Sequence, residues 1–154
     1  MKYKFLAIIA VLINSLIFSQ SNCKLEFHHS NSIILFKSVD IIFKPIKNNK
    51  KGKISIKKDR DEEYSYRISK EKFEEIYEAI QKIEYDTVAV KNNLLDGSYT
   101  DIILYDNLGN KKSFYATGLN KRSQTNKFQK DFWYATKLIV KAARLEMEDL
   151  IDYR

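Results

Sequence analysis

Histidine is scarce in this chain, and its two copies stand next to each other as His28 and His29. Neighbouring residues on a strand point to opposite faces, so the pair cannot ligate one metal ion unless the strand bulges there. No CxxC or HExxH motif accompanies them in the sequence to supply further ligands. We therefore expect ordinary surface or turn histidines, no metal site and no cofactor.

A second cluster of chemically active side chains is acidic. Asp59, Asp61 and Glu63 alternate along a charged stretch, as at the start of a calcium loop. The central glycine and the distal bidentate glutamate of such a loop are missing, and Arg60 interrupts the carboxylates. A solvated turn is the expected structure. The sequence also lacks a GxSxG motif and a glycine-rich phosphate loop, so we expect no catalytic residues.

Cys23 is the only cysteine, so no intrachain disulfide can form. It lies just after an apolar run, which makes lipidation of Cys23 one candidate modification. The preceding residues, Gln20, Ser21 and Asn22, do not match a lipobox, which requires a leucine-like residue three positions before the cysteine. The alternative is an incidental thiol near the N-terminus.

The N-terminus has the pattern of a secretory signal peptide. Lys2 and Lys4 precede an apolar run over 5–18, which is too short for a spanning helix and is interrupted at Asn14 and Ser15. We predict a signal peptide over 1–19 and a single mature domain over 20–154. The expected location is the periplasm, the outer envelope or the medium, and the alternative is an uncleaved anchor.

The charge of the chain gives a coarse guide to its partners. Its 27 basic and 20 acidic residues give a formal charge of +7, and cleavage after Ser19 would remove Lys2 and Lys4. The surplus favours anionic surfaces such as envelope lipids or acidic glycans. Export argues against nucleic acid as a partner. Membrane attachment is expected only through the signal anchor or a lipidated Cys23.

Two hairpins and two amphipathic helices are the elements that must position any site. In the hairpin over 99–117, Ile102 and Leu104 share an apolar face with Phe114 and Ala116, and Gly109 suits the turn. A second hairpin is predicted over 54–68. Helical periodicity predicts one helix that follows the N-cap Ser69 and another that follows Asn126. Shorter strands are expected at 25–27, 33–36, 41–43 and 86–90.

These elements predict an α+β fold with two layers. We expect an antiparallel sheet of about five to seven strands with both helices on one face and the N-terminal strands extending the sheet. The hairpin–helix order occurs twice in the chain. A duplicated ββα unit is one explanation, and the ordinary succession of elements in an α+β domain is the other.

The second face of the hairpin over 99–117 carries the candidate binding residues. Tyr99, Ile103, Tyr105 and Tyr115 fall on this face, with Lys111 and Lys121 near them in sequence. Exposed aromatic residues beside lysine suit a protein partner or an envelope glycan. Trp133 lies off the apolar stripe of the second helix and is a further candidate anchor. The alternative is that other elements cover these side chains.

The chain resembles small uncharacterised exported or lipoprotein-like α+β proteins of Gram-negative bacteria. The resemblance lies in Phe18-Ser19-Gln20, in DGSYTDIILYDNLGNKKSFYA over 96–116 and in the closing amphipathic helix. It implies a location and a general shape, but no site residue.

Three functions are open at this stage. The first is a non-catalytic exported binding protein. The second is an inhibitor or immunity-type protein that presents the acidic residues 59–63 to a toxin or hydrolase. The third is a small hydrolase with an unrecognised site.

Overall fold

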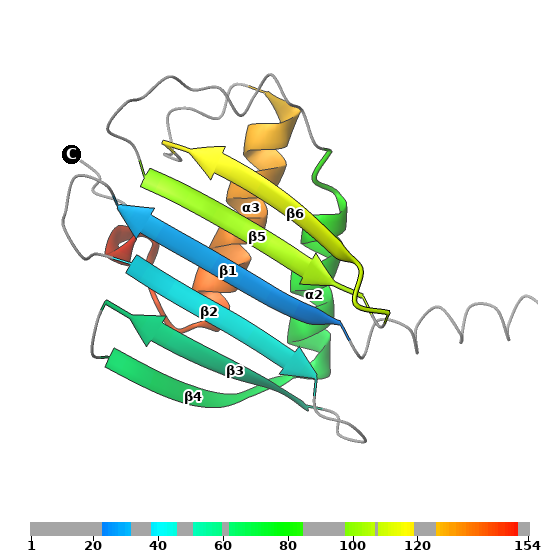
Figure 1. Cartoon of the computed structure of the whole chain (residues 1–154), viewed down its shortest axis with the longest axis vertical. Helices are drawn as coiled ribbons and strands as arrows, with labels where there is room; N and C mark the ends of the chain where they lie inside the picture. Colours follow the sequence, from blue (N-terminus) through cyan, green and yellow to red (C-terminus); the bar gives the residue numbers. More distant parts are fainter. Residues whose placement is uncertain are drawn as a thin grey trace, which may run out of the picture.

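Six antiparallel strands form one sheet in the order β4-β3-β2-β1-β5-β6, as seen in a computed structural model (Figure 1). The structure describes residues 23–31, 38–45, 51–59, 62–84, 98–106, 108–118 and 126–150. The strands are β1 (Lys24–Asn31), β2 (Ser38–Pro45), β3 (Lys51–Lys58), β4 (Glu62–Ser69), β5 (Ser98–Tyr105) and β6 (Lys111–Thr117). The signal peptide over 1–19 and the strands expected at 33–36 and 86–90 lie outside the described residues.

The N-terminal hairpin occupies the centre of the sheet. β1 pairs with β2 on one side and with β5 on the other. The expectation that the N-terminal strands extend the sheet at its margin is therefore wrong. β1 suits a central position because Leu25 and Phe27 are fully buried. The residues that pair with them on β2 and β5 are also apolar and buried. The hairpins β3–β4 and β5–β6 flank this central pair, and each is followed by a helix.

The helices begin where the sequence predicts. α2 (Lys70–Gln81) follows Ser69, whose hydroxyl accepts a hydrogen bond from the backbone N–H of Lys72. α3 (Lys127–Ala142) follows Asn126, which forms a capping box with Gln129. These side chains satisfy N–H groups that have no partner within the helix. A short 3₁₀ helix, η2 (Met147–Asp149), follows α3.

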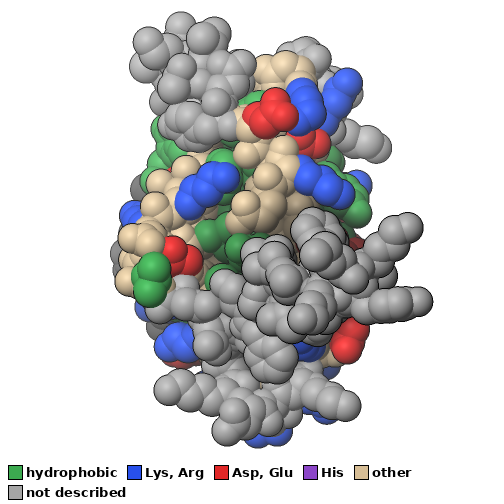
Figure 2. Space-filling model, turned by 90° about the vertical axis from the view of Figure 1, so that its right-hand side faces the viewer, with side chains coloured by type: hydrophobic (Ala, Val, Ile, Leu, Met, Phe, Trp, Pro, Cys, Tyr) green, Lys and Arg blue, Asp and Glu red, His purple; other side chains and the backbone are tan. Residues whose placement is uncertain are grey.

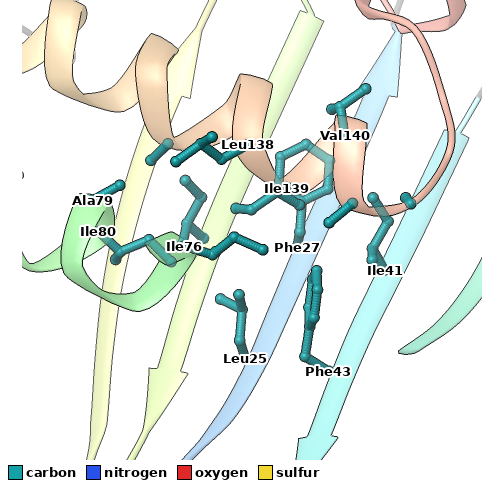
Figure 3. Close-up of a cluster of buried hydrophobic side chains, with 14 of the residues drawn as sticks. Leu25, Phe27, Ile41, Phe43, Ile76, Ala79, Ile80, Leu138, Ile139 and Val140 are labelled. Carbon is teal, nitrogen blue, oxygen red and sulfur yellow. The ribbon is translucent and has the colours of Figure 1, made fainter. Parts of the chain in front are cut away.

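Both helices pack on the same face of the sheet, so the predicted two-layer α+β architecture is confirmed (Figure 1). The core lies between the layers, where strand residues such as Phe27 and Ile41 meet helix residues such as Ile76 and Ile139 (Figure 3). At the end of α3, the Tyr64 hydroxyl donates a hydrogen bond to the Ala143 carbonyl at 3.3 Å. This bond joins the helix to the edge strand β4. None of the helices in the described part of the chain has the length and apolar content needed to cross a membrane.

Candidate functional site

The open face is the side of the sheet that faces away from α2 and α3. Along most of the strands the core residues alternate with residues that point to this face, although Ile103 on β5 points to it and is buried. The strand registers align most of these outward residues into three rows that cross all six strands, and Ser38, Ser30, Tyr99 and Thr117 form a shorter fourth row at one end. Each of the three long rows has a different chemical character.

The acidic row carries three carboxylates against one lysine. His28 stands at its centre, and its Nδ1 lies 2.7 Å from Asp40 Oδ1, while its Nε2 lies 3.7 Å from Glu26 Oε2. From β4 to β6 the acidic row consists of Glu63, Lys57, Asp40, His28, Asp101 and Tyr115. Within the row, the contact between ionisable side chains is that of His28 with Asp40.

The middle row has mostly short or apolar side chains. It consists of Ser65, Ser55, Ile42, Glu26, Ile103 and Ser113. Glu26 is the one charged member. It forms an ion pair with Lys24, and it accepts a hydrogen bond from the Tyr105 hydroxyl at 3.0 Å. Burial alone would raise the pKa of Glu26, but these two donors outweigh it and lower the pKa below its usual value.

The cationic row contains five positive side chains and no carboxylate. From β4 to β6 it consists of Arg67, Lys53, Lys44, Lys24, Tyr105 and Lys111. Lys24 forms its ion pair with Glu26 and also lies 5.1 Å from the centroid of the Tyr105 ring. The other four cations are exposed, and within the described part of the chain they form no ion pair. The row lies at the end of the sheet where β1 begins and where β5 turns into β6.

The predicted tyrosines do not form one patch. Tyr99 is 39% exposed and its ring packs against that of Tyr115, with 4.9 Å between the centroids. Its hydroxyl donates to Asp101, which together with burial raises the pKa of Tyr99 to about 12. Tyr105 is half-buried and lies six residues along β5, about 20 Å away at the usual rise of a strand. The aromatic pair therefore borders the acidic row, while Tyr105 belongs to the cationic row. Lys121 lies outside the described residues.

Trp133 is not a surface anchor. It is 6% exposed and belongs to the hydrophobic core. α3 contacts α2 as well as the sheet, so its buried stripe is wider than one helix face. The sequence pattern alone places Trp133 beside the stripe, whereas the structure buries it in the core.

The two histidines point to opposite faces, as predicted, but the expectation of a surface or turn residue is wrong for His29, which is buried. His29 is 3% exposed, and its Nε2–H donates to the Leu150 carbonyl at 3.0 Å. Since the carbonyl can only accept, Nδ1 of the neutral ring accepts from the Thr100 hydroxyl at 2.9 Å. His29 thus fastens the segment after α3 to the sheet. No three His, Cys, Asp or Glu side chains among the described residues form a group that could hold a metal ion.

The acidic stretch after β3 forms part of a turn. The Asp59 backbone N–H donates to the Ser38 carbonyl at 2.8 Å, and the Ser38 N–H donates to Asp59 Oδ1 at 3.1 Å. These bonds turn the Asp59 side chain toward β2. Asp61 lies outside the described residues, so the predicted cluster is described only at Asp59 and Glu63.

Cys23 is part of the packed domain and not of a loose terminus. Its side chain is 4% exposed, and burial raises the pKa of its thiol. It borders a surface pocket of about 210 Å³ between α2 and the turn from β5 to β6, with Tyr77, Gln81 and Lys112 also on its walls. A lipid on this sulfur would have to displace the side chain from its core contacts. Lipidation of Cys23 stays a prediction.

The cationic row is the feature that sequence reasoning missed. Lys24, Lys44, Lys53 and Arg67 each stand next to a buried residue on their own strand, which is a visible signal. Their alignment depends on the strand order and on three registers. No protein-family model matches the chain, and none of the curated proteins matches it, so the function is inferred from the geometry of the open face.

Proposed function

We propose that this chain is an exported, non-catalytic binding protein of the cell envelope that contacts an anionic partner with the open face of its sheet. The cationic row is the observation that carries the proposal. The signal-peptide pattern over 1–19 supports the location. The partners considered from sequence are a protein, an envelope glycan and anionic envelope lipids, and the charge of this row favours an anionic one.

The row is unfavourable for the isolated domain, which argues that it serves binding. Lys44 is directly opposite Lys53, and Lys53 is directly opposite Arg67. Like charges at such positions repel each other and destabilise a sheet. An anion bound across the row removes this repulsion, so the arrangement stabilises a complex more than the free protein.

Binding accounts for the open face better than catalysis does. His28 is the only titratable imidazole on this face, and in the described part of the chain its ring contacts carboxylates. A histidine paired with an acid needs a hydroxyl or thiol within hydrogen-bond reach to activate a nucleophile. The contacts of His28 instead tie β1 to β2.

A matched pair of charge variants tests this function. Lys44→Gln with Lys53→Gln neutralises the centre of the cationic row. Lys130→Gln with Lys137→Gln removes the same net charge from the exposed side of α3. On a column of sulfated polysaccharide, a generic polyanion, the row variant should elute at clearly lower salt than the native protein, and the α3 variant should elute close to it. Equal elution of the two variants would contradict the proposal.

The row variant is also expected to be folded and slightly more stable. Removing two neighbouring like charges relieves a repulsion of a few tenths of a kcal/mol, on the order of a cross-strand pair. Thermal unfolding followed by circular dichroism checks this. A large loss of stability would mean that the two lysines have a structural role and that their elution shift reports unfolding.

The acidic row favours a second candidate, an inhibitor or immunity-type protein. One of its carboxylates, that of Asp101, lies beside the packed rings of Tyr99 and Tyr115, and this combination suits a basic protein cleft. In that case Tyr99→Ser with Tyr115→Ser would abolish partner inhibition, and the Lys44 and Lys53 variant would retain it. A hydrolase assay in the presence of each variant separates the two functions.

A further inference from the structure

An exposed leucine projects beyond the cationic row. Leu108 is 87% exposed, the highest exposure of any large apolar side chain that the structure describes. It lies in the turn between Tyr105 and Lys111, which are themselves members of the row. An apolar residue this exposed makes no contribution to the core, and it lies at the same end of the molecule as the four cations of the row that form no ion pair with any described residue.

The turn holds Leu108 in place. Asp106 Oδ1 accepts hydrogen bonds from the backbone N–H groups of Leu108 and Asn110, both at 2.8 Å, and Oδ2 accepts one from the Asn110 side chain at 2.7 Å. Gly109 takes the positive φ of 82° that the turn needs. The only carboxylate of the described turn is therefore bound to the turn itself, and the side chain of Leu108 is left exposed.

From these observations we infer that this end of the sheet docks on a lipid bilayer that contains anionic headgroups. The inference rests on the proposed function and names its partner, and it adds a membrane contact to the two attachments expected from sequence, the signal anchor and a lipidated Cys23. In the docked state Leu108 enters the boundary between headgroups and acyl chains, and the cationic row contacts lipid phosphates. Figure 2 looks onto this side of the molecule, where Lys and Arg side chains lie among apolar ones.

The shape of the row fits an extended surface. Six strands about 4.8 Å apart make a row about 24 Å wide, and all its members stand at one level along the strands. The charge of the open face also changes sign along the strands, because the acidic row lies four residues away from the cationic one, beyond the middle row. This gradient orients the domain with its cationic end toward an anionic membrane.

An acidic glycan accounts for fewer of the features at this end of the sheet than a membrane does. Aromatic rings and hydrogen-bond donors in a groove hold sugars, yet the phenol of Tyr105 and the ammonium of Lys24 are engaged with Glu26. A glycan also leaves Leu108 in water. The coincidence of an exposed aliphatic residue with a row of cations is the pattern of a peripheral membrane contact.

Vesicle co-sedimentation of the full chain tests the inference. One set of vesicles contains phosphatidylcholine alone, and the other contains phosphatidylglycerol as well. The apolar segment over 5–18 contributes equally to binding on both vesicle types. The ratio of the two partition coefficients therefore measures the electrostatic part of the binding free energy. Neutralising Lys44 and Lys53 together should lower binding to the anionic vesicles about 25-fold, since each lysine near such a surface contributes about fivefold.

Two further variants separate the leucine from general hydrophobicity. Leu108→Ser should lower binding to anionic vesicles about tenfold, as expected for partial burial of one leucine. Tyr134→Ser removes another exposed apolar side chain, on the outer side of α3, and should leave binding within twofold. The Lys130 and Lys137 variant is the matched control for net charge.

The outcomes are distinct. Preference for anionic vesicles, lost in the Lys44 and Lys53 variant and weakened in Leu108→Ser, supports the inference. Equal binding to both vesicle types, with row-dependent retention on the sulfated polysaccharide, overturns the membrane partner and leaves the proposed function standing. If the protein neither prefers anionic vesicles nor shows row-dependent retention on the sulfated polysaccharide, both the membrane inference and the proposed function are overturned. Equal losses in the row variant and the α3 variant show that only net charge matters, which also overturns the inference.

Discussion

Two adjacent isoleucines on β2 test whether the helices cover only one face of the sheet. Ile41 is fully buried in the core between apolar cross-strand neighbours, Phe27 and Ile56 (Figure 3). Ile42 points to the open face, where its neighbours are Glu26 and Ser55. The same substitution at the two positions compares the two faces within one strand.

The expected magnitudes differ severalfold. Ile41→Ala leaves a cavity between the layers, and such a change destabilises by about 3–4 kcal/mol. Ile42→Ala removes a half-exposed side chain whose space water can fill, so the loss should be about 1 kcal/mol or less. Because a domain of this size has a total stability of about 5–15 kcal/mol, the first change is large and the second is small.

Urea unfolding followed by the fluorescence of Trp133 measures both values. Trp133 is the only tryptophan and is buried in α3, so its emission reports the packing of the helix layer. The slope of the unfolding free energy against urea should be the same for both variants. Equal losses at the two positions would refute the reasoning, because they would mean that both faces of β2 are packed alike.

Three further changes have defined outcomes. Gly109→Ala should destabilise by about 1 kcal/mol in urea unfolding, because a Cβ meets no atom there and only the positive φ opposes it. Asn126→Ala removes the cap of α3 and should destabilise by about 1 kcal/mol, measured in the same way. The raised pKa of Tyr99 means that the unfolded chain loses this proton first, so its contribution to stability is complete below pH 10 and disappears between pH 10 and about 12. Asp101→Asn should lower this pKa toward 10, as measured by absorbance titration of tyrosinate with a Tyr99→Phe variant as reference.

The local structure could be predicted well from the sequence. Alternation in Ile102, Leu104 and Phe114 defines a hairpin because the side-chain period of a strand is two. The caps at Ser69 and Asn126 follow from side chains that accept from early N–H groups of a helix. Both signals depend on residues close together in the chain, and both are confirmed.

The order of the strands and the composition of the open face could not be predicted. The central position of β1 depends on its pairing with β5, and 71 positions in the chain separate His29 from Thr100 in this contact. Lys44 and Lys53 are neighbours because of the register between β2 and β3. The alternation of apolar residues within each strand does not specify this register. Trp133 shows the same limit, because its burial depends on tertiary packing that the helical periodicity of its own segment does not reveal.

The most direct test of the central claim is a footprint of lysine reactivity. The protein is acetylated briefly with and without anionic vesicles, and the modified positions are quantified by mass spectrometry. The account predicts protection at Lys44, Lys53 and Lys111, with Lys130 and Lys137 on α3 unchanged. Equal reactivity at all five lysines in the presence of bound vesicles, or protection confined to α3, would contradict it.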